Sequence, residues 1–63
     1  MLEFTLPDMT CGHCVSSVTQ ALKQRDPAAD VRIELDQHRV TVQSTLDRAT
    51  LVDALTEAGY PPA

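Results

Sequence analysis

The spacing of hydrophobic residues changes its period along this chain, and the order of the changes constrains the fold more than any other feature. Period-two alternation predicts strands at 2–6, 31–35 and 40–43, and helical spacing predicts helices at 12–25 and about 47–58. The hydrophobic stripes of the two helices are expected to be Val15, Val18, Ala21 and Leu22, and Leu51, Val52, Leu55 and Ala58.

Residues that start or stop regular structure stand at the boundaries of these segments. Pro7-Asp8 ends the first strand, and Asp26-Pro27 ends the first helix because a residue before proline is disfavoured in helical conformation. Asp36-Gln37-His38 is a polar turn that joins the next two strands in a hairpin. Asp47 is a good N-cap for the second helix, and Gly59 is a natural C-terminal stop.

The order strand, helix, strand, strand, helix predicts an α+β fold of the ferredoxin-like type, with an antiparallel sheet and both helices on one face. We treat residues 1–63 as a single domain. A fourth strand, at the sheet edge beside the first, is expected to be short or absent. After Gly59 the chain continues only as Tyr60-Pro61-Pro62-Ala63, and proline has no N–H to donate to a ladder.

Composition excludes several functions. The chain has 63 residues and a net charge of −4, and its five basic residues are scattered, so it lacks the basic surface of a nucleic-acid binder. No stretch approaches the roughly 20 apolar residues of a membrane span, and the N-terminal residues do not resemble a secretory signal. We therefore expect a cytoplasmic protein, without membrane insertion, in which a cysteine pair serves metal binding or redox chemistry.

The two cysteines lie in Met9-Thr10-Cys11-Gly12-His13-Cys14, where the first strand gives way to the first helix. Free N–H groups and the dipole at a helix start favour the thiolate form, which both binds metals and attacks disulfides. Gly12 is expected to let the loop bend so that both sulfurs converge. Cys11 and Cys14 are therefore candidates either for a soft-metal site or for a redox pair.

The number of available ligands favours a metal that accepts two thiolates. A structural zinc site usually has four ligands, whereas two soft thiolates suit Cu(I). We expect His13 to face solvent, with a role as an auxiliary ligand kept open. His38 is expected in the hairpin turn, far from the cysteines, so that its replacement by alanine would be silent. Cys-Gly-His-Cys is also a tetrapeptide of protein disulfide isomerases, but the chain is too short for their fold and has no Trp before Cys11.

The motif with Met two residues before the first cysteine resembles the metal-binding loop of heavy-metal-associated domains, as found in bacterial copper chaperones and copper-transporting P-type ATPases. Glu57-Ala58-Gly59-Tyr60 is similar to that family's Glu-Ala-Gly-Tyr ending. The resemblance implies that Cys11 and Cys14 bind Cu(I), that Met9 packs beneath the loop, and that Tyr60 lies near it.

Two positions near the cysteines bear on metal binding and on which metal is bound. Asp8 stands where the family usually has Gly, which adds a negative charge near the loop without removing binding. Zinc-exporting relatives carry an Asp directly before the first cysteine, and Thr10 in that place argues against zinc.

The resemblance implies a cytosolic Cu(I) metallochaperone, not an enzyme, that delivers copper by ligand exchange to a copper-transporting P-type ATPase or to its metal-binding domain. We expect a monomer when metal-free, with a copper-bridged dimer as a further state. The alternatives are a carrier of Hg(II) or Zn(II), a dithiol–disulfide redox module, and a metal-binding piece of a larger transporter.

Overall fold

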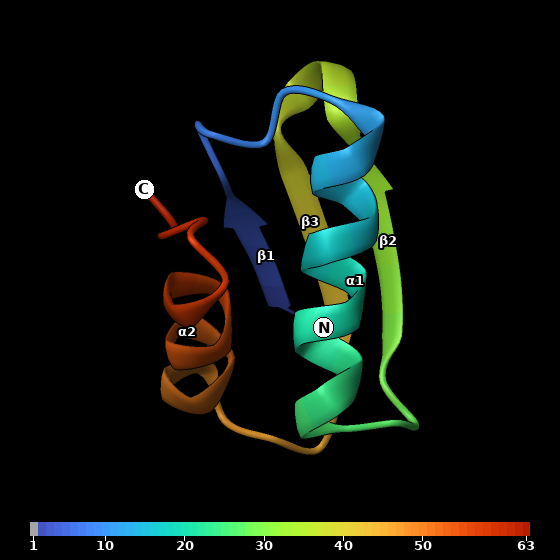
Figure 1. Ribbon diagram of the computed structural model, residues 1–63. Helices are drawn as coiled ribbons and strands as arrows, with labels where there is room; N and C mark the ends of the chain where they lie inside the picture. Colours follow the sequence, from blue (N-terminus) through green and yellow to red (C-terminus); the bar gives the residue numbers. More distant parts are fainter. Residues whose placement is uncertain (1) are drawn as a thin grey trace.

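The helices and strands follow one another in the predicted order in the computed structural model, which describes residues 2–63 (Figure 1). They are β1 (Leu2–Thr5), α1 (Gly12–Arg25), β2 (Asp30–Glu34), the short 3-10 turn η1 (Leu35–Gln37), β3 (Arg39–Gln43) and α2 (Arg48–Glu57). Neither helix is long and apolar enough to cross a membrane within the part of the chain that the structure describes.

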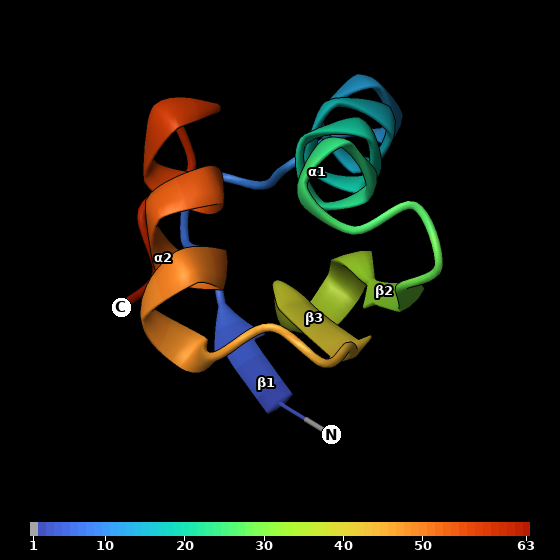
Figure 2. The same ribbon diagram turned by 90° about the horizontal axis from the view of Figure 1, so that it is seen from below.

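The three strands form an antiparallel sheet in the order β1-β3-β2, so β3 lies in the centre. Phe4 pairs with Val40, and Val31 pairs with Val42. Both helices cover the same face of the sheet, as the view along the layers shows (Figure 2). This arrangement confirms the predicted ferredoxin-like α+β fold.

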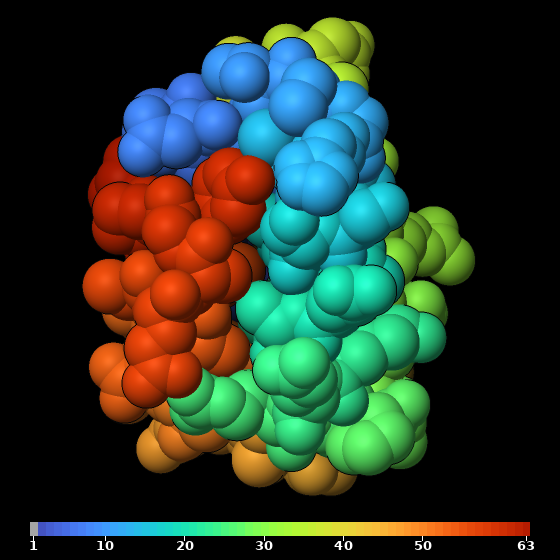
Figure 3. Space-filling model, in the orientation of Figure 1, coloured from blue at the N-terminus to red at the C-terminus, as the bar shows by residue number. Residues whose placement is uncertain are grey.

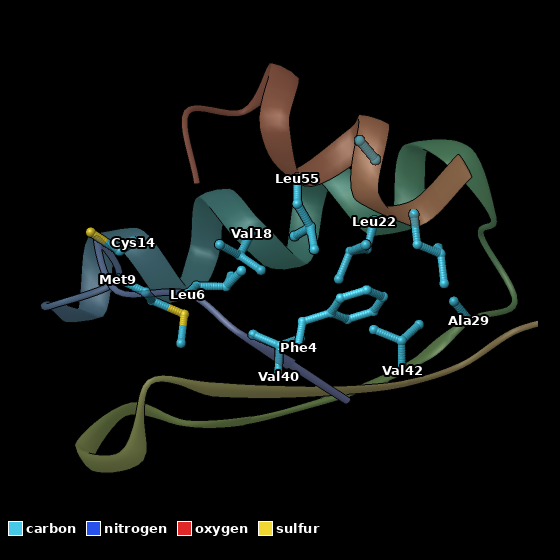
Figure 4. Packing of buried hydrophobic residues seen from close by; sticks show 12 residues of the cluster. Phe4, Leu6, Met9, Cys14, Val18, Leu22, Ala29, Val40, Val42 and Leu55 are labelled. Carbon is cyan, nitrogen blue, oxygen red and sulfur yellow. The ribbon is translucent and has the colours of Figure 1, made fainter. Parts of the chain in front are cut away.

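The core lies between this sheet face and the two helices (Figure 4). Its largest fully buried side chains are Leu6, Met9, Val18, Leu22, Val40, Val42, Leu51 and Leu55. Full burial of each such side chain contributes about 1.5–3 kcal/mol. The core is therefore built from the hydrophobic residues whose spacing predicted the helices and strands, together with Met9 from the loop before α1.

The buried stripe of each helix differs from the predicted one. In α1 the buried residues are Cys14, Val18 and Leu22, whereas Val15 and Ala21 are half-buried. These buried positions are four residues apart, so they lie on the one side of the helix that packs on the sheet. Cys14 belongs to that side. In α2 the buried residues are Leu51, Ala54 and Leu55, whereas Val52 and Ala58 lie at the edge of the stripe.

Asp47 caps α2 and Asp26 follows the last residue of α1, as predicted. The Asp47 carboxylate accepts a hydrogen bond from the Thr50 N–H at 2.9 Å, which caps α2. Asp26 ends α1, and its carboxylate accepts bonds from the Ala28 N–H at 3.1 Å and the Ser44 hydroxyl at 2.6 Å. The second bond joins the two loops at the end of the sheet opposite the cysteines.

The connection between β2 and β3 starts one residue earlier than predicted. Leu35 was expected in the strand, but it starts η1, because the His38 N–H donates to the Leu35 carbonyl at 3.1 Å and closes a helical turn. His38 ends this turn in the left-handed region, with φ of 54°.

No fourth strand follows α2 within residues 2–63, which agrees with the prediction of a short or absent one. The C-terminal segment runs along the free edge of β1, where the Ala63 N–H donates to the Thr5 carbonyl at 2.8 Å. Pro61 and Pro62 have no N–H groups with which to extend this contact into a ladder.

Replacement of Gly59 by alanine should destabilise the protein by about 1–2 kcal/mol, because Gly59 has φ of +92°, where a Cβ is strained. Gly12→Ala is the matched control. Gly12 lies in α1 outside the left-handed region, and a Cβ there would meet nothing within 4 Å. Urea unfolding measures both variants, and equal loss of stability in the two would contradict this assignment of strain.

Candidate metal centre

The loop from Leu6 to Cys11 connects β1 to α1 through a turn that buries a methionine. The Met9 N–H donates to the Leu6 carbonyl at 3.0 Å, so Pro7 and Asp8 form the exposed corner of the turn. The Met9 side chain is fully buried and lies in the core below the start of α1 (Figure 4). Met9 therefore supports the loop from beneath.

The two cysteine sulfurs lie 3.2 Å apart at the start of α1. Cys11 is the N-cap residue with extended backbone, and Cys14 lies in the first turn of the helix. Their surroundings differ, because Cys11 is exposed whereas Cys14 is only 8% exposed. The pair thus presents one sulfur that a partner molecule can reach freely and one that the core holds in place.

The Tyr60 hydroxyl interacts with the Cys14 thiol, and this interaction is the main cause of an acidic thiol. Together with a backbone hydrogen bond from Thr10 and the nearby Cys11 thiol, it lowers the pKa of Cys14 from its ordinary value of 9.0 to about 6. The same contact raises the pKa of Tyr60, whose hydroxyl donates to the thiolate. The Cys14 thiol therefore ionises more readily than an ordinary cysteine thiol, and the thiolate is the form that binds metal.

Gly59 directs Tyr60 toward the cysteines. The Tyr60 N–H donates to the Leu55 carbonyl at 2.9 Å across the left-handed Gly59, which turns the chain back at the end of α2. In the space-filling view the red C-terminal segment lies against the blue loop and the start of α1 (Figure 3). The helix start predicted a lowered cysteine pKa, and the tyrosine at the opposite end of the chain is a further cause that local sequence did not indicate.

His13 is exposed in the first turn of α1. Among residues 2–63, no third His, Cys, Asp or Glu side chain joins the two sulfurs in a group of three that could hold a metal ion. The site therefore offers two thiol ligands and an open side, a donor set that suits a soft ion of low coordination number.

His38 is not remote from this loop, contrary to expectation. Its ring Nδ1 lies 2.8 Å from the Met9 carbonyl oxygen, and its own carbonyl accepts a bond from the Leu6 N–H at 2.8 Å. Because β1 runs antiparallel to β3, the end of β1 and the start of β3 lie at the same end of the sheet (Figure 1). Strand order could have placed His38 here, since its turn directly precedes β3.

Gly12 does not supply the bend that was expected of it. It is the first residue of α1 and lies outside the left-handed region, with open space where a Cβ would be. The change of direction occurs earlier, in the turn between Leu6 and Met9. The sulfurs converge because Cys11 and Cys14 are three residues apart at a helix start, where side chains at this spacing share a face.

The chain is similar in sequence to one protein family and to proteins that are named for copper. The sequence model of the family described as "Heavy-metal-associated domain" matches residues 3–61. Copper-transporting ATPase 1 of Rhizobium meliloti is 38% identical over 60 residues, which cover 92% of this chain and 7% of that protein. The copper chaperone CopZ of Staphylococcus aureus is 34% identical over 55 residues, which cover 82% of this chain and 81% of that protein. The chain thus spans 7% of the length of the ATPase and most of the length of the chaperone.

Solved structures agree in fold over nearly the whole chain. The copper chaperone Atx1 from Synechocystis PCC6803 superposes with a TM-score of 0.98 at 32% identity, covering 100% of both chains. A gold binding protein superposes with a TM-score of 0.95 at 35% identity, covering 98% of this chain and 95% of that one.

Tyr60→Phe should raise the pKa of Cys14 toward its ordinary value, because the ring stays in place but the hydroxyl no longer stabilises the thiolate. The rate of Cys14 alkylation as a function of pH measures this in a Cys11→Ser background, where a single thiol titrates. Coinciding profiles with Tyr60 and with Phe at this position would show that the hydroxyl does not act on Cys14.

Proposed function

The chain belongs to the heavy-metal-associated domain family, and from this membership we propose that it is a copper chaperone that carries Cu(I) on Cys11 and Cys14. The observation that supports this best is the pair of sulfurs 3.2 Å apart at the start of α1, one exposed and one buried. Copper is the cargo of such a site, and we propose no catalytic activity for the chain.

The donor set favours Cu(I) over the alternative metals. Zn(II) prefers four ligands, and the two sulfurs have no third protein ligand beside them within residues 2–63. Cu(I) is soft and accepts thiolates at low coordination number. Hg(II) and Au(I) share this preference, so a direct competition between metals must decide the cargo. His13 remains a candidate auxiliary ligand when a partner or more copper is present.

Delivery would proceed by exchange of thiolate ligands on the metal. Cys11 is exposed at the helix N-cap, whereas Cys14 is buried, so we propose that the bond of Cys11 to copper is the first to be replaced. A partner thiolate adds to the metal to give three sulfur ligands, and Cys11 then leaves and takes up a proton. A second partner thiolate then replaces Cys14 in the same way, so copper ends with two sulfur ligands, and Cu(I) is neither oxidised nor reduced.

We propose a copper-transporting P-type ATPase, or its metal-binding domain, as the partner. Support comes from the relatives themselves, because a segment of two Rhizobium meliloti copper-transporting ATPases is 38% identical to this chain. A donor and an acceptor built on the same loop can share one ion between equivalent cysteine pairs. We place this exchange in the cytoplasm, with the metal-free chain as a monomer and a copper-bridged dimer as a second state.

The reduced protein should bind one Cu(I) per chain, and loss of either cysteine should weaken binding by more than about a hundredfold. Loss of a residue that only supports a ligand already costs about 10–100-fold, so loss of one of two ligands should exceed this. Anaerobic titration against a Cu(I) chelator measures the affinity, with Ser16→Ala as an exposed control on the same helix. Zn(II) and Hg(II) are titrated in parallel. Displacement of Cu(I) by equimolar Zn(II), or tight binding by Cys14→Ser, would overturn the copper assignment.

Copper-loaded protein should transfer its ion to a metal-free ATPase domain of the same family within seconds, and to a Cys-to-Ser form of that domain not at all. Separation of the two proteins followed by metal analysis measures the transfer. The redox alternative makes a different prediction, because a dithiol oxidoreductase would reduce insulin disulfides without metal. Insulin reduction at the rate of a disulfide isomerase would favour that alternative.

A further inference from the structure

His38 occupies an unusual backbone conformation at the end of the hairpin. Its φ of 54° places it in the left-handed region, which non-glycine residues adopt rarely. Such a conformation persists where the surrounding contacts hold the residue in place. The contacts of His38 therefore indicate what this conformation achieves.

Two hydrogen bonds join His38 to the two ends of one turn. Its main-chain carbonyl accepts from the Leu6 N–H at 2.8 Å, and its ring Nδ1 contacts the Met9 carbonyl oxygen at 2.8 Å. Because a carbonyl oxygen only accepts, Nδ1 must carry the proton and donate. The Met9 N–H also donates to the Leu6 carbonyl, at 3.0 Å. His38 is therefore hydrogen-bonded to both residues that form this turn.

The turn leads directly to the exposed metal ligand. Met9 is fully buried and lies two residues before Cys11, whose own side chain provides no cap hydrogen bond to α1. The Cys11 sulfur has the Cys14 sulfur as its hydrogen-bond partner. The backbone on the N-terminal side of Cys11 is thus held through Met9, and Met9 is held through His38.

We propose that His38 is the positioning residue of Cys11: its Nδ1–H···O bond to Met9 fixes the loop backbone and so slows the release of the metal from the exposed sulfur. The part that concerns metal release rests on the function proposed above. The part that concerns the loop holds for the protein without metal and is tested separately.

Three replacements of His38 separate the hydrogen bond from the backbone conformation. Asn carries an N–H donor on Cγ, where His carries Nδ1, and tolerates the left-handed region. Asp has the same shape and tolerance but only accepts when ionised, so it cannot donate to the Met9 carbonyl. Gly adopts the left-handed region without strain but has no donor. Gln37→Gly, in the exposed part of the same turn, controls for added flexibility.

The first measurement is amide hydrogen exchange of Leu6 and Met9 in the metal-free, reduced protein. The second is the rate at which a chelator removes Cu(I) from the loaded protein. We expect both rates, amide exchange and Cu(I) removal, to stay within about twofold of those of the natural chain in His38→Asn. His38→Asp and His38→Gly should be faster by about fivefold, the equivalent of one net hydrogen bond, while Gln37→Gly is unchanged.

If His38→Gly exchanges and releases like the natural chain, the ring bond does not position the loop and the proposal is wrong. It is equally wrong if Asn behaves like Asp. If His38→Asp fails to fold, the comparison of Gly with Asn still decides. Failure of the natural chain to bind Cu(I) would overturn the proposed function, whereas the exchange of the Leu6 and Met9 amides would still decide the role of His38.

Discussion

The antiparallel pairing of β1 with the central strand β3 is the constraint on which the rest of this structure depends. The backbone ladder from Leu2 opposite Val42 to Thr5 opposite Arg39 brings the end of β1 beside the start of β3. The loop that carries the cysteines and the hairpin turn that ends at His38 therefore meet at one end of the sheet. Without this pairing the loop would depend on Met9 and the helix start alone.

The proposed metal centre combines two environments within one helical turn. Cys14 belongs to the buried side of α1, and its interaction with Tyr60 lowers its pKa. Cys11 is exposed at the N-cap, so under the proposed function it can separate from the metal without disturbing the core. A carrier must both retain its ion and release it to a partner, and a pair of unlike ligands allows both, because one sulfur can stay bound while the other is replaced.

The short C-terminal segment contributes a side chain to the cysteine site and a single backbone hydrogen bond to the sheet. Gly59 turns the chain so that Tyr60 reaches Cys14, and the Ala63 N–H then adds one bond to the edge of β1. The residues between, Pro61 and Pro62, cannot form a ladder. The edge of β1 is thus covered by a segment that contributes a single backbone bond, and the more important contact of that segment is the tyrosine hydroxyl.

The sequence by itself determined the features that depend on neighbours along the chain. Alternating and helical spacing predicted the strands and helices, and Asp47 and Gly59 were recognised as helix ends from their chemistry. The cysteine pair and its preference for a soft metal also followed from local residues, because ligand type and spacing are local properties.

Only the tertiary structure decided which distant residues meet the site. His38 lies 29 residues from Met9 in the chain, and the two are brought together by strand order, which hydrophobic spacing does not reveal. The rotation of α1 that buries Cys14 instead of Val15 follows from how the helix packs on the sheet. The acidity of Cys14 depends chiefly on a tyrosine from the other end of the chain. Periodicity indicates which kind of element a segment forms, whereas packing decides which residues are buried and which of them touch.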